Sequence, residues 1–268
     1  MRDSHRDLLA DLVLAHQMAD LADSITLARF QSNDLVIETK PDLTPVTDAD
    51  KATERAIRDV IAKERPDDLV IGEEYGAPDS TDGKYYWVID PIDGTKNFVR
   101  GIPVWATLIA LVNPDHHVVV GVVSSPALAR RWSAAEGNGA FVTANGGGAK
   151  RLQVSGVSKI EDAQLSYSDL IGWGSRKEAM LRLQEQVWRT RGIGDFWSHM
   201  LVAEGAVDIA VEPVLALWDM APLDIIVREA GGRFTNIDGI DGPHGRSGVS
   251  SNSILHKDFI SALNAEEK

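Results

Sequence analysis

The sequence predicts an α/β protein made of two halves, and two patterns carry this prediction. In residues 1–147, two helical segments precede several apolar, strand-like runs joined by short turns. In residues 148–268, strand-like and helical segments alternate. Successive strands favour antiparallel pairing, whereas alternation is typical of layered helix and sheet folds. We therefore expect an amino-terminal α+β half and a carboxy-terminal α/β half, divided at the glycine-rich loop 146–148.

Two helices are expected at the amino end. Over 8–30, apolar residues recur at helical spacing, which predicts one long helix. Thr47 is suited to be an N-cap, and Asp50 stands at the capping-box position three residues later. A second helix is therefore expected over about 48–63, ended by Pro66.

The remaining elements follow from short apolar runs and from helical periodicity between turn residues. In the first half, strands are expected at 69–72, 85–89, 104–112, 117–124 and 131–135. In the second half, we expect a strand at 163–167, helices at 175–189 and 197–204, a strand at 207–211, a helix at 219–230 and a strand at 233–235.

Composition excludes several classes of function. The chain can bury a core, since 44% of its residues are hydrophobic, and its net charge of −13 argues against nucleic acid or an anionic membrane as a partner. It has no cysteine, which excludes disulfides, thiolate zinc sites and thiol nucleophiles. No run approaches the roughly 20 apolar residues of a membrane span, and the first residues do not resemble a secretion signal. We expect a cytoplasmic protein.

The segment DPIDGTKNF, which begins at Asp90, is the most informative in the chain. Asp90 and Asp93 follow an apolar strand and offer the oxygen ligands that a hard divalent cation such as Mg²⁺ prefers. Pro91 is expected to bend the chain out of the strand, and Gly94 lets the backbone approach an anion. The amides of Gly94 and Thr95 are then free to face a phosphate.

Further acidic residues stand where an element begins or ends. They are Asp48 with Asp50, Glu73 with Glu74, and Asp219 after Trp218. Functional side chains concentrate at such positions, but each group also has a simpler interpretation as helix-start acids, a solvated turn or an N-cap. Trp218 is expected to pack under the metal-binding loop and to hold Asp219 in place.

Three segments together resemble one protein family. DPIDGTKNF, GEE at 72–74 and WDMAPLDIIVREAGG at 218–232 are similar to motifs of the inositol monophosphatase family, which comprises Mg²⁺-dependent, lithium-sensitive phosphatases. The resemblance covers nearly the whole chain. It implies a layered αβαβα sandwich of the sugar-phosphatase type and a homodimer. It also implies hydrolysis of a small phosphomonoester by a metal-activated water, without a covalent enzyme intermediate.

The resemblance also implies the metal ligands. Glu73, Asp90 and the backbone carbonyl of Ile92 would hold one cation, and Asp90, Asp93 and Asp219 a second. One ion would lower the pKa of the attacking water and the other would stabilise the leaving oxygen. A third, weaker ion is proposed for the family beside Glu73, so we expect two or three Mg²⁺ ions. Mn²⁺ is an alternative, because oxygen ligands alone do not separate the two metals.

The same resemblance assigns the catalytic groups. Thr95 and Asp48 match the family's water-activating pair, in which the hydroxyl orients the water and the carboxylate relays its proton. Glu73 completes the expected catalytic set. The free amides of Gly94 and Thr95 would hold phosphate oxygens, and Asp219 would also face the substrate.

The substrate is expected to carry a positive charge. The run GDFW at 194–197 places an acid and two aromatics where the inositol branch has small residues. Asp195 and Glu212 are suited to pair with an amine, and an aromatic beside them is suited to stack on a flat ring or cation. This pattern resembles the branch that hydrolyses L-histidinol phosphate in histidine biosynthesis. In the simpler interpretation, Asp195 is only an N-cap and the aromatics only pack.

Two alternatives stay open at this point. One is an inositol-1-monophosphatase or a related small sugar-phosphate phosphatase. The other is a non-catalytic binding partner of transcription or RNA-processing machinery, which the acidic charge disfavours. The seven histidines show no ligand spacing and are expected at the surface or in packing. The loop 239–248, with His244 and Arg246, is expected to be a surface turn that does not cover the site.

Overall fold

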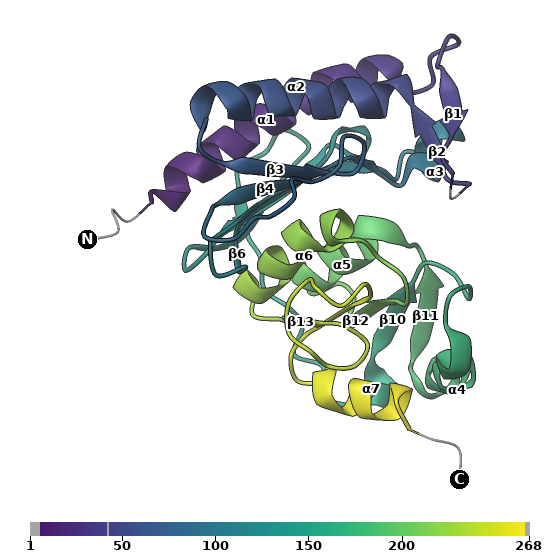
Figure 1. The fold of residues 1–268 in the computed structure, drawn as a ribbon. Helices are drawn as coiled ribbons and strands as arrows, with labels where there is room; N and C mark the ends of the chain where they lie inside the picture. Colours follow the sequence, from purple (N-terminus) through teal and green to yellow (C-terminus); the bar gives the residue numbers. More distant parts are fainter. Residues whose placement is uncertain (1–5, 42, 266–268) are drawn as a thin grey trace.

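The computed structural model describes residues 6–41 and 43–265 and has five layers (Figure 1). Helices α1 (Leu8–Arg29) and α2 (Asp48–Glu64) cover one face of a seven-stranded sheet. Helices α5 (Asp195–Ala203) and α6 (Leu217–Glu229) lie between this sheet and a five-stranded sheet. Helices α4 (Lys177–Gln186) and α7 (His256–Leu263) cover the far face of the five-stranded sheet. The predicted α/β class and layered αβαβα sandwich are confirmed.

The first two helices begin where the sequence predicts. Helix α1 starts after Asp7, whose side chain accepts hydrogen bonds from the next turn. At α2, the Asp50 carboxylate accepts from the Thr47 amide at 2.8 Å and the Asp50 amide donates to the Thr47 hydroxyl at 3.4 Å. This capping box satisfies amides that have no partner inside the helix and fixes the orientation of Asp50.

The seven-stranded sheet has the order β3-β4-β5-β6-β7-β8-β9, with only the β3–β4 pair parallel. Its strands are β3 (Leu69–Gly72), β4 (Tyr86–Asp93), β5 (Ala106–Val112), β6 (Val118–Ser125), β7 (Arg130–Ala135), β8 (Gly139–Ala144) and β9 (Lys150–Arg151). The predicted strands before residue 136 are present, and β8 and β9 extend the set. Because β9 pairs with β8, the first sheet continues past the loop 146–148.

One expectation for this sheet is wrong. The strand predicted at 85–89 does not end there, and Pro91 does not turn the chain out of it, because β4 continues to Asp93. Both Asp90 and Asp93 pair with β5, but the register shifts between them. In a regular strand, residues three apart face opposite sides, so this irregularity allows both carboxylates to face the same cavity.

The five-stranded sheet has the order β11-β10-β12-β14-β13. Its strands are β10 (Gln164–Tyr167), β11 (Arg189–Gly192), β12 (Ile209–Glu212), β13 (Arg233–Thr235) and β14 (Gly248–Ser251). The helix expected at 175–189 ends at Gln186 instead, because Val187 is extended with ψ 156° and Arg189 begins β11. Strands β11 and β14 and helix α7 were not predicted.

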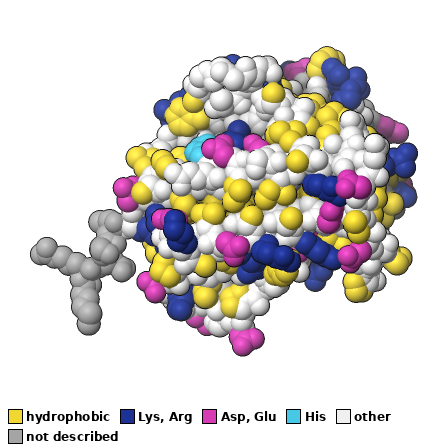
Figure 2. Space-filling view, turned by 90° about the horizontal axis from the view of Figure 1, so that it is seen from above, with side chains coloured by type: hydrophobic (Ala, Val, Ile, Leu, Met, Phe, Trp, Pro, Cys, Tyr) yellow, Lys and Arg dark blue, Asp and Glu magenta, His cyan; other side chains and the backbone are white. Residues whose placement is uncertain are grey.

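Shorter elements complete the fold. They are the hairpin β1 (Ile37–Thr39) and β2 (Pro45–Thr47), helix α3 (Thr95–Val99), and 3₁₀ turns at Pro126–Leu128, Ile160–Asp162 and Gly174–Arg176. Basic and acidic side chains are interspersed over the face formed by α1 and α2 (Figure 2). No helix among the described residues is long and apolar enough to cross a membrane.

Close packing of α6 against the first sheet brings the two halves of the chain together. A Cβ added at Gly121 of β6 would lie 2.6 Å from the Ile225 Cγ2 and 3.0 Å from the Pro222 carbonyl, so α6 approaches the sheet through this glycine. The amino end of α6 then lies near the end of β4. Asp219 therefore lies close to the Asp90 segment, although well over a hundred residues separate them in sequence.

Candidate active site

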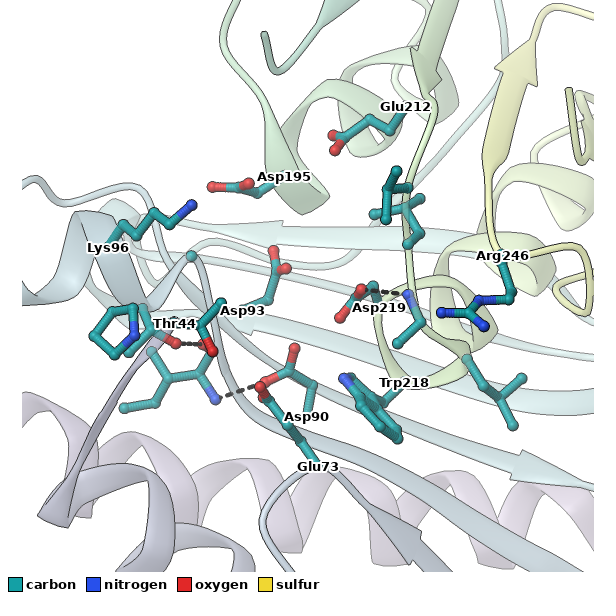
Figure 3. A pocket seen from close by; sticks show the side chains of 18 residues that line it. Thr44, Glu73, Asp90, Asp93, Lys96, Asp195, Glu212, Trp218, Asp219 and Arg246 are labelled. Atoms are coloured by element: carbon teal, nitrogen blue, oxygen red, sulfur yellow. Dashed lines mark hydrogen bonds between the residues drawn. The ribbon is translucent and has the colours of Figure 1, made fainter. Parts of the chain in front are cut away.

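A cavity of about 700 Å³ lies where the end of β4 meets the amino ends of α5 and α6 (Figure 3). Both halves of the chain line it. The lining includes Glu73, Asp90, Asp93, Thr95, Lys96, Asp195, Glu212, Trp218, Asp219 and Arg246. Cavities of this size are typical of small-molecule sites.

Three of the predicted metal ligands converge in this cavity. Oxygen atoms of Asp90, Asp93 and Asp219 all lie within 4.8 Å of one another. Burial, and then repulsion from neighbouring carboxylates, raises the pKa of Asp90 and of Asp93 well above the usual range. Burial likewise raises the pKa of Asp219 to about 7. Three shielded carboxylates at this spacing fit divalent cations, whose charge would offset the repulsion.

The predicted ligands Glu73 and Ile92 lie beside this cluster. Glu73 lines the cavity, and its carboxylate forms an ion pair with Lys40 at 2.6 Å. The Ile92 amide donates to the Asp90 carboxylate at 2.9 Å, and the Ile92 carbonyl accepts from the Thr95 hydroxyl at 2.9 Å. Glu73 is close enough to Asp90 to help raise the pKa of that carboxyl, and Ile92 also lines the cavity.

The predicted pairing of Thr95 with Asp48 is wrong. The carboxylate near the Thr95 hydroxyl is that of Asp50, at 3.5 Å, whereas Asp48 is paired with Arg29 at 2.8 Å and its side chain is 40% exposed. The capping box explains the difference, since it turns the Asp50 carboxylate inward. Burial raises the pKa of Asp50 to about 7, and the capping position was the sequence signal that could have identified it.

Gly94 has the conformation that its predicted role requires. Its φ is +81°, and a Cβ there would lie 3.0 Å from the Val104 carbonyl and 3.2 Å from the Asp195 carboxylate. Helix α3 begins at the next residue, Thr95. The first amides of a helix have no intrahelical acceptor, so those near Gly94 are available to an anion in the cavity.

Asp195 and Glu212 face the cavity from the second half of the chain (Figure 3). Asp195 is not the N-cap of α5, because that position is Gly194. Its φ is +48°, and its carboxylate accepts a hydrogen bond from Asn97 at 3.2 Å. Glu212 is 5% exposed, and burial, followed by repulsion from Asp195, raises its pKa to about 8.

Comparison with known proteins identifies the family. A model of the inositol monophosphatase family matches residues 9–268. The chain belongs to this family. The resemblance inferred from the three motifs is therefore confirmed.

Relatives refine the position of the chain within the inositol monophosphatase family. It is 54% identical to a histidinol-phosphatase of Mycobacterium tuberculosis over 95% of this chain and 98% of that protein. It is 53% identical to a histidinol-phosphatase of Streptomyces coelicolor over 96% of this chain and 98% of that protein. Among solved structures, an IMPase of Thermotoga maritima has a TM-score of 0.84 and 29% identity, covering 95% of this chain and 97% of that chain.

The aromatic residues that line the cavity are not those expected from the sequence. Phe196 is 1% exposed and packs against Trp132 with ring centroids 5.9 Å apart, and Trp197 is packed against the same core. Neither lines the cavity. Trp218 does line the cavity, and it is also packed against the core.

Two basic residues of the site were missed or misjudged. Lys96 lies inside the DPIDGTKNF motif, lines the cavity and points toward Asp195 in Figure 3. Arg246 also lines the cavity, so the expectation that its loop is an idle surface turn is wrong. Its φ of +57° is uncommon for a non-glycine residue and is a backbone feature that the sequence does not reveal.

Proposed function

We propose that this chain hydrolyses L-histidinol phosphate to L-histidinol and phosphate, with Mg²⁺ as cofactor. The observation that carries the proposal is that one cavity joins two acidic groups. Asp90, Asp93 and Asp219 suit the cations that a phosphate ester needs, and Asp195 and Glu212 suit an amine or imidazole. Two relatives that are more than half identical over nearly their whole length are histidinol-phosphatases.

The fit of the cavity to cations supports the cofactor. Asp90, Asp93 and Asp219, with Glu73 and the Ile92 carbonyl, would hold two or three Mg²⁺ ions, and Mn²⁺ suits the same oxygen ligands. When bound, such ions supply the positive charge that activates the attacking water and stabilises the leaving oxygen.

The chain's own groups orient the reactants. The Thr95 hydroxyl lies 2.9 Å from the Ile92 carbonyl and 3.5 Å from the Asp50 carboxylate, and it has one proton to donate. When that proton is donated to Asp50, the Thr95 oxygen is left to accept a hydrogen bond from the attacking water. Asp50, rather than Asp48, is the carboxylate placed to receive the proton through Thr95. The amides near Gly94 and Thr95 hold the phosphate oxygens.

The second acidic group separates this proposal from its main alternative. Inositol 1-phosphate and related sugar phosphates carry no cation for Asp195 and Glu212, so they cannot form the charge-assisted hydrogen bonds that an amine or imidazole would form with these carboxylates. A non-catalytic binding role has less support still, because the metal ligands expected for the family are all in or beside the cavity.

The test compares phosphate release from histidinol phosphate and from inositol 1-phosphate, each with Mg²⁺ and with EDTA. We expect turnover that EDTA abolishes and a kcat/KM for histidinol phosphate at least about tenfold higher, which is the scale of one charge-assisted hydrogen bond. Equal or reversed values would overturn the substrate assignment. Turnover of neither ester would favour the binding role.

Three further parts of the proposal concern the whole protein. We propose that it acts as a homodimer, that it is cytoplasmic, and that its partner is a small phosphate ester rather than nucleic acid or a membrane. The net charge of −13 supports the last point. Light scattering coupled to gel filtration would measure the oligomeric state. The division of the chain near residue 147 also stays a prediction.

A further inference from the structure

Two buried histidines of the second half differ in the hydrogen bonds that their ring nitrogens form. His256 has a partner on each nitrogen: Nε2 lies 2.9 Å from the Thr235 hydroxyl and Nδ1 lies 2.8 Å from the Ser251 hydroxyl. His199 is also fully buried, and its Nδ1 lies 2.6 Å from the Ser250 hydroxyl. Its Nε2, however, has no hydrogen-bond partner among the described residues.

The unpartnered nitrogen of His199 faces Glu212. The distance from His199 Nε2 to Glu212 Oε1 is 3.9 Å, and Oε1 also lacks a hydrogen-bond partner among the residues that the structure describes. This is longer than a hydrogen bond. Buried polar atoms without partners are rare and costly, so two of them facing each other at the wall of a cavity call for an explanation.

The fold places Ser250, Glu212 and His199 at the interface between α5 and the five-stranded sheet. Ser250 is opposite Ala210 across the β12–β14 pair, and Glu212 follows two residues along β12, so both side chains point to the face that α5 covers. His199 lies on α5 one turn after Asp195. The helix therefore holds His199 against the sheet while its first residue, Asp195, faces the cavity.

We propose that His199 is a positioning residue, which orients the Glu212 carboxylate for the cationic nitrogen of the substrate. This inference rests on the proposed function. In the proposed tautomer, Ser250 donates to Nδ1, and the proton of the neutral ring is on Nε2, which faces Glu212 Oε1. When a cationic group enters, the carboxylate is ionised and the 3.9 Å contact shortens to a hydrogen bond, as often happens when a site is filled.

The protonation preferences of the pair agree with this geometry. Burial lowers the pKa of His199 to about 3, so the ring stays neutral and carries a single proton. Burial raises the pKa of Glu212 to about 8, so its carboxylate needs a donor and a nearby cation to be ionised at neutral pH. Ser168 already donates a hydrogen bond to this carboxylate, His199 supplies a second donor for the unpartnered Oε1, and the substrate supplies the cation.

The test uses four variants of the full chain. His199→Leu removes the donor, His199→Gln keeps an amide N–H near the position of Nε2, and His199→Asn keeps a polar group only near Nδ1. His256→Leu is the matched control, because it removes an equally buried histidine that does not contact Glu212. For each variant, kcat and KM are measured with histidinol phosphate and with glycerol 2-phosphate, which has no cationic group, and the melting temperature is recorded.

We expect His199→Leu and His199→Asn to raise KM for histidinol phosphate about tenfold, the value of one hydrogen bond to a charged group, with kcat changed less than about threefold. KM for glycerol 2-phosphate stays the same, His199→Gln restores KM, and His256→Leu lowers only the melting temperature. Because His199→Asn and His199→Gln both keep a polar side chain, they provide the comparison if His199→Leu does not fold.

Two outcomes overturn different conclusions. If the unsubstituted protein shows no preference for histidinol phosphate, the proposed substrate is wrong and the inference falls with it. If the preference exists and all His199 variants keep the KM of the unsubstituted protein, or lose affinity for both esters equally, His199 has a structural role and only the inference is overturned.

Discussion

Asp48 and Asp50 stand two residues apart at the start of α2, yet the helix directs them to different partners. Asp48 pairs with Arg29 of α1 at the surface, and Asp50 turns inward to Thr47 and Thr95. A carboxylate that relays a proton has to reach the reacting groups, so the geometry favours Asp50 over Asp48 for the proposed role.

The two aspartates are therefore expected to respond differently to the same change. Asp50→Asn should lower kcat by about 10²-fold or more, the usual contribution of a general base. Asp48→Asn should leave kcat nearly unchanged and alter only thermal stability. Steady-state kinetics at saturating Mg²⁺ measures both, with circular dichroism as the check on folding. If Asp48→Asn loses more kcat than Asp50→Asn, Asp48 rather than Asp50 is the partner of Thr95, as the sequence predicted.

Asp195 gives a second prediction at this scale. Asp195→Asn keeps the size of the side chain but removes the charge, so KM for histidinol phosphate should rise about tenfold while KM for inositol 1-phosphate does not. Asp169→Asn is a suitable control, because Asp169 lies near enough to influence the pKa of Asp195 but does not line the cavity. If both variants have the same KM for histidinol phosphate, Asp195 makes no ionic contact that determines specificity.

At the scale of elements, α6 connects packing to the site. Gly121→Ala should destabilise the protein by about 1–3 kcal/mol, the usual cost of overpacking, because the added methyl lies 2.6 Å from Ile225. Gly148→Ala is the control, since its Cβ would meet no described atom within 4 Å. Urea unfolding measures the free energies. Because α6 carries Asp219, Mg²⁺ affinity measured by calorimetry should fall in Gly121→Ala only.

The elements that sequence analysis found are those whose signals are local. The capping box fixed the start of α2, and apolar runs between turns gave most strands of the first sheet. Strand β11 was missed because its sequence RTRG has no apolar run, and it forms only by pairing with β10. The helix before β11 was predicted to be too long, because helical periodicity in the sequence continues past the point where the backbone becomes extended. That point is Val187, where the chain already runs toward its pairing with β10.

The site was predictable to a similar extent. The residues expected to bind metal lie in motifs with fixed spacing, and the cavity brings Asp90, Asp93 and Asp219 together as expected. Lys96 and Arg246 depend on which way a side chain points after the chain has folded, and no local pattern contains that information.

At the scale of the whole molecule, the acidic cluster links stability to metal and to pH. In the metal-free protein, burial and repulsion raise the pKa of Asp90 and Asp93, and burial raises that of Asp219 to about 7. The folded state then retains protons that the unfolded chain, with carboxyl pKa values near about 4, has already released. Stability therefore falls as pH rises between about 4 and 7.

This gives a prediction that needs no substrate. In EDTA, the melting temperature should decrease as the pH rises from about 5 to about 8. With Mg²⁺ the decrease should be smaller, because bound cations favour the ionised carboxylates and bind only the folded state. Differential scanning fluorimetry across this pH range measures both curves. Parallel curves would mean that the cluster does not bind the metal.

Helix α5 touches both ends of the cavity. The amide of Phe196 donates to the Asp93 carboxylate at 2.9 Å, and the same helix carries Asp195 and His199. In the proposed mode of binding, one helix therefore sets the separation between the phosphorus and the nitrogen of a bound ester. Esters whose carbon skeleton is one methylene longer or shorter are expected to bind more weakly, which would add selection by molecular length to selection by charge.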